Sequence, residues 1–79
     1  MRPRDTHRYI LREGRDIVMY GITYDLDARE AEHQRDHPRA VMTVDGPAVT
    51  REAALAWERM RIEQYCKAHG GRRPKYNKV

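Results

Sequence analysis

Cysteine is almost absent from this chain. Cys66 is the only one among its 79 residues, so an intramolecular disulfide is impossible and a zinc site built from several thiolates is excluded. A chain without disulfides has no need of an oxidising compartment. We therefore expect it to work in the reducing cytoplasm.

Long apolar runs and large aromatic side chains are also scarce. No stretch approaches the roughly 18 apolar residues that cross a membrane, and the first residues lack the apolar core of a signal peptide, so we expect no membrane partner. Phenylalanine is missing, and Trp57 is the only tryptophan. A chain of this length has room for one thin core, which predicts a single domain over residues 1–79.

Positive charge, in contrast, is abundant. Sixteen Lys and Arg oppose twelve Asp and Glu, which gives a formal net charge of +4, and thirteen of the sixteen cations are Arg. The planar guanidinium group of Arg binds phosphate through two parallel hydrogen bonds, which the ammonium group of Lys cannot do. The balance therefore indicates an anionic polymer as partner, DNA or alternatively RNA. A basic surface without a partner explains the same composition equally well.

Three segments have the composition of β-strands. Segments 8–12 and 16–22 are rich in apolar and aromatic residues, and Gly14 between them supplies a tight turn, which predicts a β-hairpin. Segment 40–44, A-V-M-T-V, reads as a third strand, because apolar and β-branched residues dominate it and turn residues follow.

Two helices are expected between and after these strands. The first covers 26–35, with Thr23 or Asp25 as its N-cap, and the second follows Thr50 as its N-cap and extends to residue 68. The predicted fold class is therefore α/β. It is a small three-stranded antiparallel sheet with flanking helices, in β-β-α-β-α order.

One acidic residue lies on the apolar side of the second predicted helix. At about 100° per residue, Glu58 falls between Ala54 and Ile62 in the middle of the apolar face. A carboxylate that faces a core is costly unless it is paired, protonated or bound to a metal. An ion pair with Arg61, or with a cation on another element, is one explanation. A metal ligand or an acid-base group at the edge of the sheet is the other.

Arg29 and His33 are four residues apart on the first predicted helix, so both lie on one face of it. A cation beside a titratable imidazole suits a negatively charged ligand. Together with Tyr9, Tyr20 and the inward Glu58, this pair could serve metal-assisted phosphodiester hydrolysis. The alternatives are an exposed ion pair of Arg29 with an acidic neighbour on its own helix, and ordinary strand packing for the tyrosines.

These motifs resemble the GIY-YIG nuclease family over nearly the whole chain and in the same order. The segment R-Y-I-L carries Tyr9 at the place of the family's first tyrosine, and M-Y-G-I-T carries Gly21 at the place of its glycine. The segment T-Y-D-L, which begins at Thr23, is similar to the family's T-x-D-L linker. The resemblance continues with Arg29, with His33, with Glu58 in A-L-A-W-E-R-M-R-I, and with Asn77 in P-K-Y-N.

The resemblance implies a metal-dependent endonuclease that hydrolyses DNA phosphodiester bonds. In the family one divalent cation, Mg²⁺ or alternatively Mn²⁺, is held by the glutamate, here Glu58, and Mg²⁺ suits a single carboxylate because it keeps most of its waters. Arg29 would meet the charge that develops on the phosphoryl oxygens. Tyr9, joined by Tyr20 if that side chain reaches, would position or deprotonate the attacking water, and His33 is the alternative base.

Two positions depart from the family pattern: Arg8 replaces the small, apolar lead-in of the first motif, and the second departure is the more serious one. The family's second tyrosine lies two residues before the glycine, where this chain has Met19, and Tyr20 is one residue away. A slip of one residue turns a strand side chain to the opposite face of the sheet, so either a bulge re-aims Tyr20 or the phenol is lost. The second interpretation makes the chain a catalytically impaired nucleic-acid-binding protein on the same fold.

The end of the chain is basic and predicts further contacts with nucleic acid. Arg72, Arg73 and Lys75 could follow a phosphate backbone while Tyr76 stacks on a base, and a solvated tail is the alternative. So small a domain offers few side chains that read bases. Specificity would therefore come from a homodimer, a partner protein or the shape of the DNA.

Overall fold

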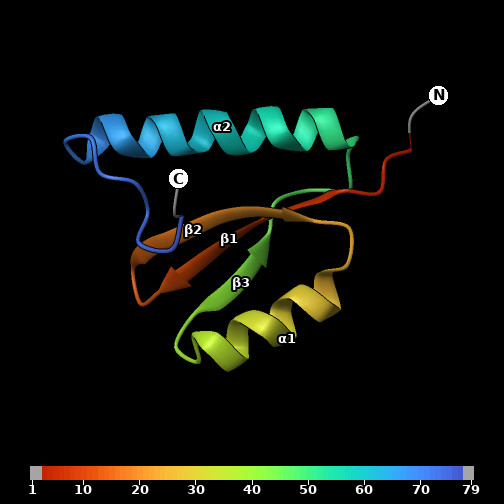
Figure 1. Cartoon of the computed structure of the whole chain (residues 1–79), viewed down its shortest axis with the longest axis horizontal. Helices are drawn as coiled ribbons and strands as arrows, with labels where there is room; N and C mark the ends of the chain where they lie inside the picture. The colour runs from red at the N-terminus through yellow and green to blue at the C-terminus, as the bar shows by residue number, and fades with distance from the viewer. Residues whose placement is uncertain (1–2, 78–79) are drawn as a thin grey trace.

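The chain folds as two hairpin strands, a helix, a third strand and a second helix (Figure 1). The computed structural model describes residues 3–77, so the two residues at each end of the predicted domain lie outside the described part. The predicted order of elements is confirmed, and every boundary lies within one residue of its predicted place. The elements are β1 (His7–Glu13), β2 (Asp16–Thr23), α1 (Leu26–Asp36), β3 (Val41–Val44) and α2 (Arg51–Ala68).

The three strands form one antiparallel sheet in the order β2-β1-β3, so the first strand is the central one. α2 runs across one face of this sheet, and α1 lies on the other side of it (Figure 1). The predicted α/β class, a three-stranded antiparallel sheet with flanking helices, is therefore confirmed. Of the helices within residues 3–77, none combines the length and the apolar composition that crossing a membrane requires.

Alternate side chains of the strands pack on opposite faces of the sheet and build two small clusters. On the face toward α2, Ile10 and Tyr20 pack with Trp57, the large anchor of that helix. Burial of one such side chain contributes about 1.5–3 kcal/mol, so a few residues supply much of the stability of this thin core. The cluster on the opposite face consists of Tyr9, Leu11, Val18 and Ala40.

A β-bulge interrupts the pairing of β1 with β2. The strands pair regularly up to Leu11 and Met19, and the register then skips Val18. Val18 and Met19 consequently pack on the same face, with the cluster that contains Tyr9. Between the bulge and the end of β2 the alternation is regular, so Tyr20 faces α2.

α1 is held by its cap and by side-chain contacts rather than by a buried face. Of the two predicted N-caps, Asp25 is the one used, because its carboxylate accepts a hydrogen bond from the Ala28 amide at 3.1 Å. The Thr23 hydroxyl supports the turn by accepting from the Asp25 amide at 3.0 Å. None of the residues of α1 is buried. The position of this helix therefore depends on the few side chains that reach the sheet.

α2 begins at its predicted cap and is the better anchored helix. The Thr50 hydroxyl accepts a hydrogen bond from the Ala53 amide at 3.2 Å. Ala54 and Trp57 are buried against the sheet. The chain leaves the helix through Gly70 and Gly71, whose φ angles of 65° and 90° are left-handed and favour glycine.

The segment after α2 returns along the outer edge of β2 and forms hydrogen bonds with backbone groups of that strand. The side-chain amide of Asn77 accepts from the Tyr20 amide at 2.8 Å and donates to the Tyr20 carbonyl at 2.9 Å. The Tyr76 amide donates to the Val18 carbonyl at 2.8 Å. Backbone groups of an edge strand need such partners. Asn77 therefore closes part of the sheet edge with a side chain instead of a strand.

Candidate active site

Tyr9 is the most deeply placed residue of the predicted site. It lies in the central strand β1, only 1% of its surface is exposed, and its partner across the strand pair is Gly21. The Tyr9 ring lies directly over the backbone of Gly21, and a Cβ atom at position 21 would overlap the end of the ring and its hydroxyl. Gly21 therefore leaves the space that lets the phenol extend across β2, the edge strand.

The Gly21→Ala variant is expected to be destabilised by about 1–3 kcal/mol, the usual cost of adding a methyl group to packed surroundings. The ring cannot move away freely because Tyr9 belongs to the buried cluster. Urea unfolding checks the effect. In a Tyr9→Ala background the same substitution should cost much less, since the ring that the methyl meets is gone. An equal cost in both backgrounds would contradict the proposed contact.

Tyr9 and His33 form a hydrogen-bonded pair between β1 and α1. The hydroxyl oxygen of Tyr9 lies 2.9 Å from Nε2 of His33. Burial raises the pKa of Tyr9 to about 12. Burial also lowers the pKa of His33, and the positive charges of Arg29 and His37 lower it further. Near neutral pH the phenol therefore keeps its proton and the imidazole is uncharged, so the hydroxyl donates to Nε2.

The lowered pKa of His33 makes the stability fall in acid. Below the ordinary value of 6.5 the unfolded chain gains a proton at His33 before the folded chain does, so the free energy of unfolding decreases as the pH falls through this range. We expect a loss of less than about 1 kcal/mol, since the site is only partly buried. Urea unfolding near neutral pH and near pH ~5 measures it.

Two variants test this pH dependence. His33→Gln removes the group held responsible, and His69→Gln is the matched control. The first should reduce the acid loss of stability because it removes the half-buried imidazole whose pKa is lowered. The second removes an imidazole near the end of α2 that contacts Tyr65 instead of Tyr9, and it should keep the wild-type difference. Identical losses in the wild type and His33→Gln would show that His33 is not the group responsible.

Arg29 lies one turn before His33 on α1 and close to the Tyr9–His33 pair. Burial is the main cause of both pKa shifts, and the positive charge of Arg29 is the next cause, lowering the pKa of each group. Arg29 also lies 3.8 Å from the carboxylate of Glu32, and these side chains are 42% and 52% exposed. The predicted alternative, an ion pair within the helix, is therefore present. So exposed a pair contributes little, and a phosphate can replace Glu32.

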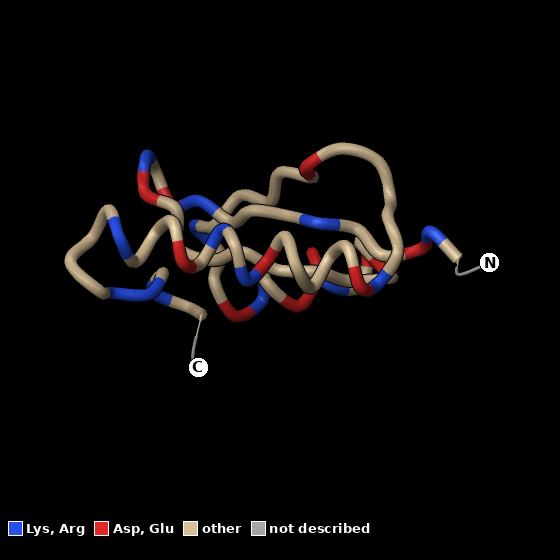
Figure 2. Tube along the Cα trace, turned by 90° about the horizontal axis from the view of Figure 1, so that it is seen from above, with Lys and Arg blue, Asp and Glu red and all other residues tan. Residues whose placement is uncertain are grey.

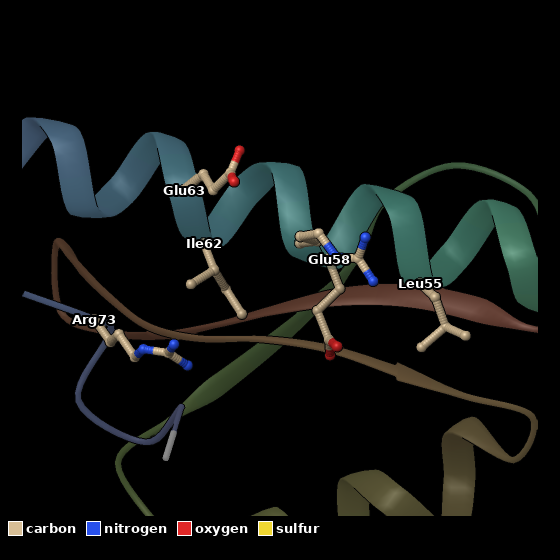
Figure 3. A pocket seen from close by; sticks show the side chains of 6 residues that line it. Leu55, Glu58, Ile62, Glu63 and Arg73 are labelled. Carbon is tan, nitrogen blue, oxygen red and sulfur yellow. The ribbon is translucent and has the colours of Figure 1, made fainter. Parts of the chain in front are cut away.

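Glu58 projects from α2 toward the sheet, where it is half-buried and lines a pocket. Figure 3 shows its carboxylate at the level of β2, whereas the carboxylate of Glu63 points to the other side of the helix. Burial raises the pKa of Glu58. Burial and the charge of Arg29 have the largest effects on the pKa of Tyr9. The negative charge of Glu58 comes next and raises this pKa. The acid on α2 thus lies within electrostatic reach of the phenol on β1.

The ion pair suggested as a structural explanation for Glu58 does not form within residues 3–77. Arg61 instead lies 4.0 Å from the carboxylate of Asp45 and 5.9 Å from the ring centroid of Trp57. Among the described residues, Glu58 makes no ion pair or hydrogen bond. An inward carboxylate with a raised pKa and no cationic partner is what a bound cation would stabilise.

Tyr20 lies on the opposite face of the sheet from Tyr9. Its ring packs edge-on against Trp57, with centroids 5.9 Å apart and planes at 81°. The bulge at Val18 precedes Tyr20, and regular alternation follows it, so the bulge does not re-aim this side chain toward Tyr9. The residue on the Tyr9 face is Met19. The structure therefore does not bring Tyr20 to the Tyr9–His33 pair.

The basic tail is only partly free to meet nucleic acid. Arg72 and Arg73 are exposed, and Arg73 lines a pocket with Glu58 (Figure 3). Lys75, in contrast, lies 3.9 Å from the carboxylate of Glu13. The remaining member of this predicted set, Tyr76, is half-buried.

Tyr76 is fixed between three neighbours. Its ring stacks on His37 with centroids 3.7 Å apart, and the ammonium of Lys75 lies 5.3 Å from the ring centroid on its own segment. Its hydroxyl donates to the carboxylate of Glu13 at 2.6 Å. The predicted stacking of Tyr76 on a base is therefore not available in this conformation, because contacts within the protein already use the ring. The sequence could not show this, since His37 and Glu13 are far from Tyr76 along the chain.

Charges of both signs are distributed along the molecule. Figure 2 shows Lys and Arg interspersed with Asp and Glu instead of gathered on one element. The formal net charge of +4 is therefore spread over the molecule. It does not form one basic surface that would attract DNA over a broad area. Binding of a phosphate has to come from individual arginines near the site.

A single carboxylate is the metal ligand that this site offers. Within residues 3–77, no group of three or more His, Cys, Asp or Glu side chains is arranged to hold a metal ion. Mg²⁺ needs no such cage, because it commonly binds one or two carboxylates and takes its other ligands from waters and substrate phosphates. Glu58, inward and without a cationic partner, fits that mode of binding.

Two residues near the site carry only a weak signal in the sequence. Tyr24 and Arg51 line a hollow together with Arg29, although Arg51 lies 22 positions after Arg29 in the sequence. Arg51 is the first residue of α2, where acidic residues are the favourable choice. A cation at a helix position that favours acidic residues was the one local sign in the sequence that could have pointed to Arg51.

The geometry brings a protonated phenol, a neutral imidazole, a guanidinium and an unpaired carboxylate to the same part of the molecule. They come from β1, α1 and α2: the phenol and the imidazole are hydrogen-bonded, and Arg29 and Glu58 are near enough to influence the pKa of Tyr9. Such a set can hold and move a proton, bind a phosphate and hold a divalent cation. Comparisons with protein-family models, with curated proteins and with solved structures found no match to this chain.

Proposed function

We propose that this chain is a metal-dependent endonuclease that hydrolyses DNA phosphodiester bonds, as its resemblance to the GIY-YIG family implies. The observation that carries the proposal is the hydrogen bond of 2.9 Å between the Tyr9 hydroxyl and His33 Nε2. A phenol whose proton already points at a neutral imidazole forms a ready path for a proton. Arg29 and Glu58 lie within electrostatic reach of that pair, and phosphodiester hydrolysis uses groups of both kinds.

In the proposed reaction, Tyr9 and His33 act as a proton relay. A water oxygen attacks the phosphorus, and its proton passes to the Tyr9 oxygen while the phenol proton passes to His33 Nε2. The new P–O bond forms as the bond to the leaving sugar oxygen breaks, and that oxygen takes a proton from solvent. Tyr9 keeps its own proton before the reaction because its pKa is about 12, so it acts through the relay and not as a free phenolate.

Arg29 and Glu58 help to stabilise the negative charge of the phosphate, Arg29 directly and Glu58 through the cation. Arg29 stabilises the negative charge that builds up on the phosphoryl oxygens. Glu58 holds the divalent cation, which when bound supplies Lewis-acid stabilisation of the phosphate and the leaving oxygen. Burial of the Glu58 carboxylate, which raises its pKa, also strengthens its attraction for a cation.

Access to Tyr9 requires a movement of α1. The Tyr9 side chain is almost closed to solvent, and His33 covers its hydroxyl. α1 has no buried residue, so a small displacement of this helix exposes the phenol at low cost. The proposed cycle therefore includes opening of α1 before water and DNA enter.

A plasmid-nicking assay tests the proposal. Supercoiled DNA is incubated with the purified chain in Mg²⁺ or Mn²⁺, and in parallel with EDTA. The expected result is a relaxed product in the metal-containing reactions and none with EDTA. Absence of cleavage with either metal, for protein shown to be folded by circular dichroism, would refute the endonuclease function.

The second candidate is a catalytically impaired nucleic-acid-binding protein on the same fold. The specific observation in its favour is that Tyr20 faces α2, so Met19 stands where the resemblance calls for a phenol beside Tyr9. This candidate predicts retention of DNA that weakens with salt, and no cleavage under any condition. The two functions therefore separate in one experiment that reads binding and nicking on the same preparation.

A further inference from the structure

The hollow that Arg29 shares with Tyr24 and Arg51 lies at the end of the molecule where β2 leads into α1 and α2 begins (Figure 1). The hollow has a volume of about 200 Å³. Pockets that enclose whole small ligands are larger, at about 300–1,000 Å³, so this one suits a single chemical group. It is lined by Thr6, Ile22, Thr23, Tyr24, Arg29 and Arg51.

Arg51 is placed against the local electrostatic preference. It is the first residue of α2, where the positive end of the helix dipole disfavours a cation. Within the described residues it makes no ion pair or hydrogen bond that would compensate. A charge that breaks a local rule without a structural gain points to a function. An anion bound in the hollow would satisfy Arg51 and Arg29 together.

Tyr24 supplies an aromatic surface to the lining of the same hollow. Its surface is 79% exposed, and it is the most exposed of the large apolar side chains. Among residues 3–77 its ring stacks on no other ring and its hydroxyl makes no hydrogen bond. Exposed aromatic rings of this kind bind nucleobases by stacking, whatever the base.

We propose that this hollow binds the phosphate next to the scissile one, with an unpaired base of the same DNA strand stacked on Tyr24. The inference rests on the proposed function, because Arg29 is shared by the hollow and the candidate active site. Successive phosphates of one strand are neighbours along its backbone, and a guanidinium has several N–H donors, so Arg29 can lie between two of them. Arg51 then holds the second phosphate. Since the ring can stack only on a base that has left its pair, the substrate is DNA that is single-stranded beside the cut.

The test is a binding titration in EDTA, where no cleavage occurs. The probes are a labelled single strand of about 12 nucleotides and the corresponding duplex. Arg51→Gln should weaken binding of the single strand about 10-fold and lower the salt dependence by about one phosphate contact. Tyr24→Ala should weaken single-strand binding about 5- to 100-fold and leave duplex binding unchanged.

Arg35→Gln is the matched charge control, since Arg35 lies near the other end of α1 and its side chain is 75% exposed. It should change affinity much less than Arg51→Gln. Equal losses in these two variants, equal effects of Tyr24→Ala on both probes, or no binding by the wild type would each overturn the inference.

The outcome also separates this inference from the proposed function. Protein that shows the expected losses of binding but never nicks a plasmid supports the hollow as a DNA site and refutes the endonuclease. Protein that nicks a plasmid while both variants bind like the wild type refutes the hollow alone.

Discussion

Glu58→Gln is expected to abolish metal-dependent nicking, with a loss of at least about 100-fold. A metal ion that stabilises the transition state is worth several kcal/mol, and each ~1.4 kcal/mol is a factor of ten in rate. Glutamine keeps the size of the side chain but removes the charge that holds the cation. The initial rate of plasmid relaxation in Mg²⁺ measures the effect.

Glu63→Gln is the matched control for Glu58→Gln. It makes the same change of charge on the same helix, but its carboxylate points away from the sheet (Figure 3), so we expect activity close to that of the wild type. Similar losses in both variants would mean that Glu58 acts only through the net charge. Full activity in Glu58→Gln would remove the metal site from the proposal.

Glu58→Gln should also be slightly more stable toward unfolding than the wild type at neutral pH. The pKa of Glu58 is raised by burial, so the folded chain holds this proton more tightly than the unfolded chain does. Ionisation of Glu58 therefore costs stability above the ordinary value of 4.5, and the cost disappears as the pH falls below it. A gain in stability joined to a loss of activity distinguishes a functional carboxylate from one that merely supports the fold.

Tyr9→Phe is expected to lower the nicking rate by about 10²- to 10⁴-fold, the usual contribution of general acid-base catalysis. Phenylalanine fills the same space over Gly21 but cannot pass a proton to His33. The fold should persist with a loss of about 0.5–1.5 kcal/mol, the usual net contribution of one hydrogen bond, because the His33 imidazole that loses its partner is only half-buried. Rate measurement and urea unfolding on one preparation separate the two effects.

Tyr65→Phe provides the control for Tyr9→Phe, since Tyr65 lies on α2 and stacks on His69 with centroids 3.7 Å apart. It should retain wild-type activity. Tyr20→Phe should have only a small effect, because that ring packs against Trp57 on the opposite face. If Tyr20→Phe stopped cleavage and Tyr9→Phe did not, the assignment of the reacting phenol would be reversed.

Local patterns predicted most of the fold. Caps, turns and apolar alternation are properties of neighbouring residues, which is why Thr50 and the segments of regular structure were correctly placed. The inward direction of Glu58 followed from helix periodicity alone, and Figure 3 shows its side chain directed toward the sheet. The order of the strands depends on pairing between distant segments, and the sequence left it open.

The uncertain parts of the site were those set by distant contacts. A bulge shifts the phase of a strand by one residue, so the direction of Tyr20 could not be read from spacing around Gly21. Tyr76 was predicted to meet a base, but His37 and Glu13 engage it from elsewhere in the chain. The role of the tail at the edge of β2 likewise depends on its return after α2.

Arg29 and His33 lie on α1, a helix that separates from the sheet at a low cost in free energy. Since none of its residues is buried, its amides should exchange with solvent deuterium through local opening, at a free energy well below that of global unfolding. α2 and the central strand should exchange only when the whole domain unfolds. Bound DNA would raise the protection of α1 most strongly, because this helix opens locally when free and gains a contact with DNA through Arg29. On warming, catalytic competence should therefore disappear before the sheet melts, and the substrate itself should postpone that loss.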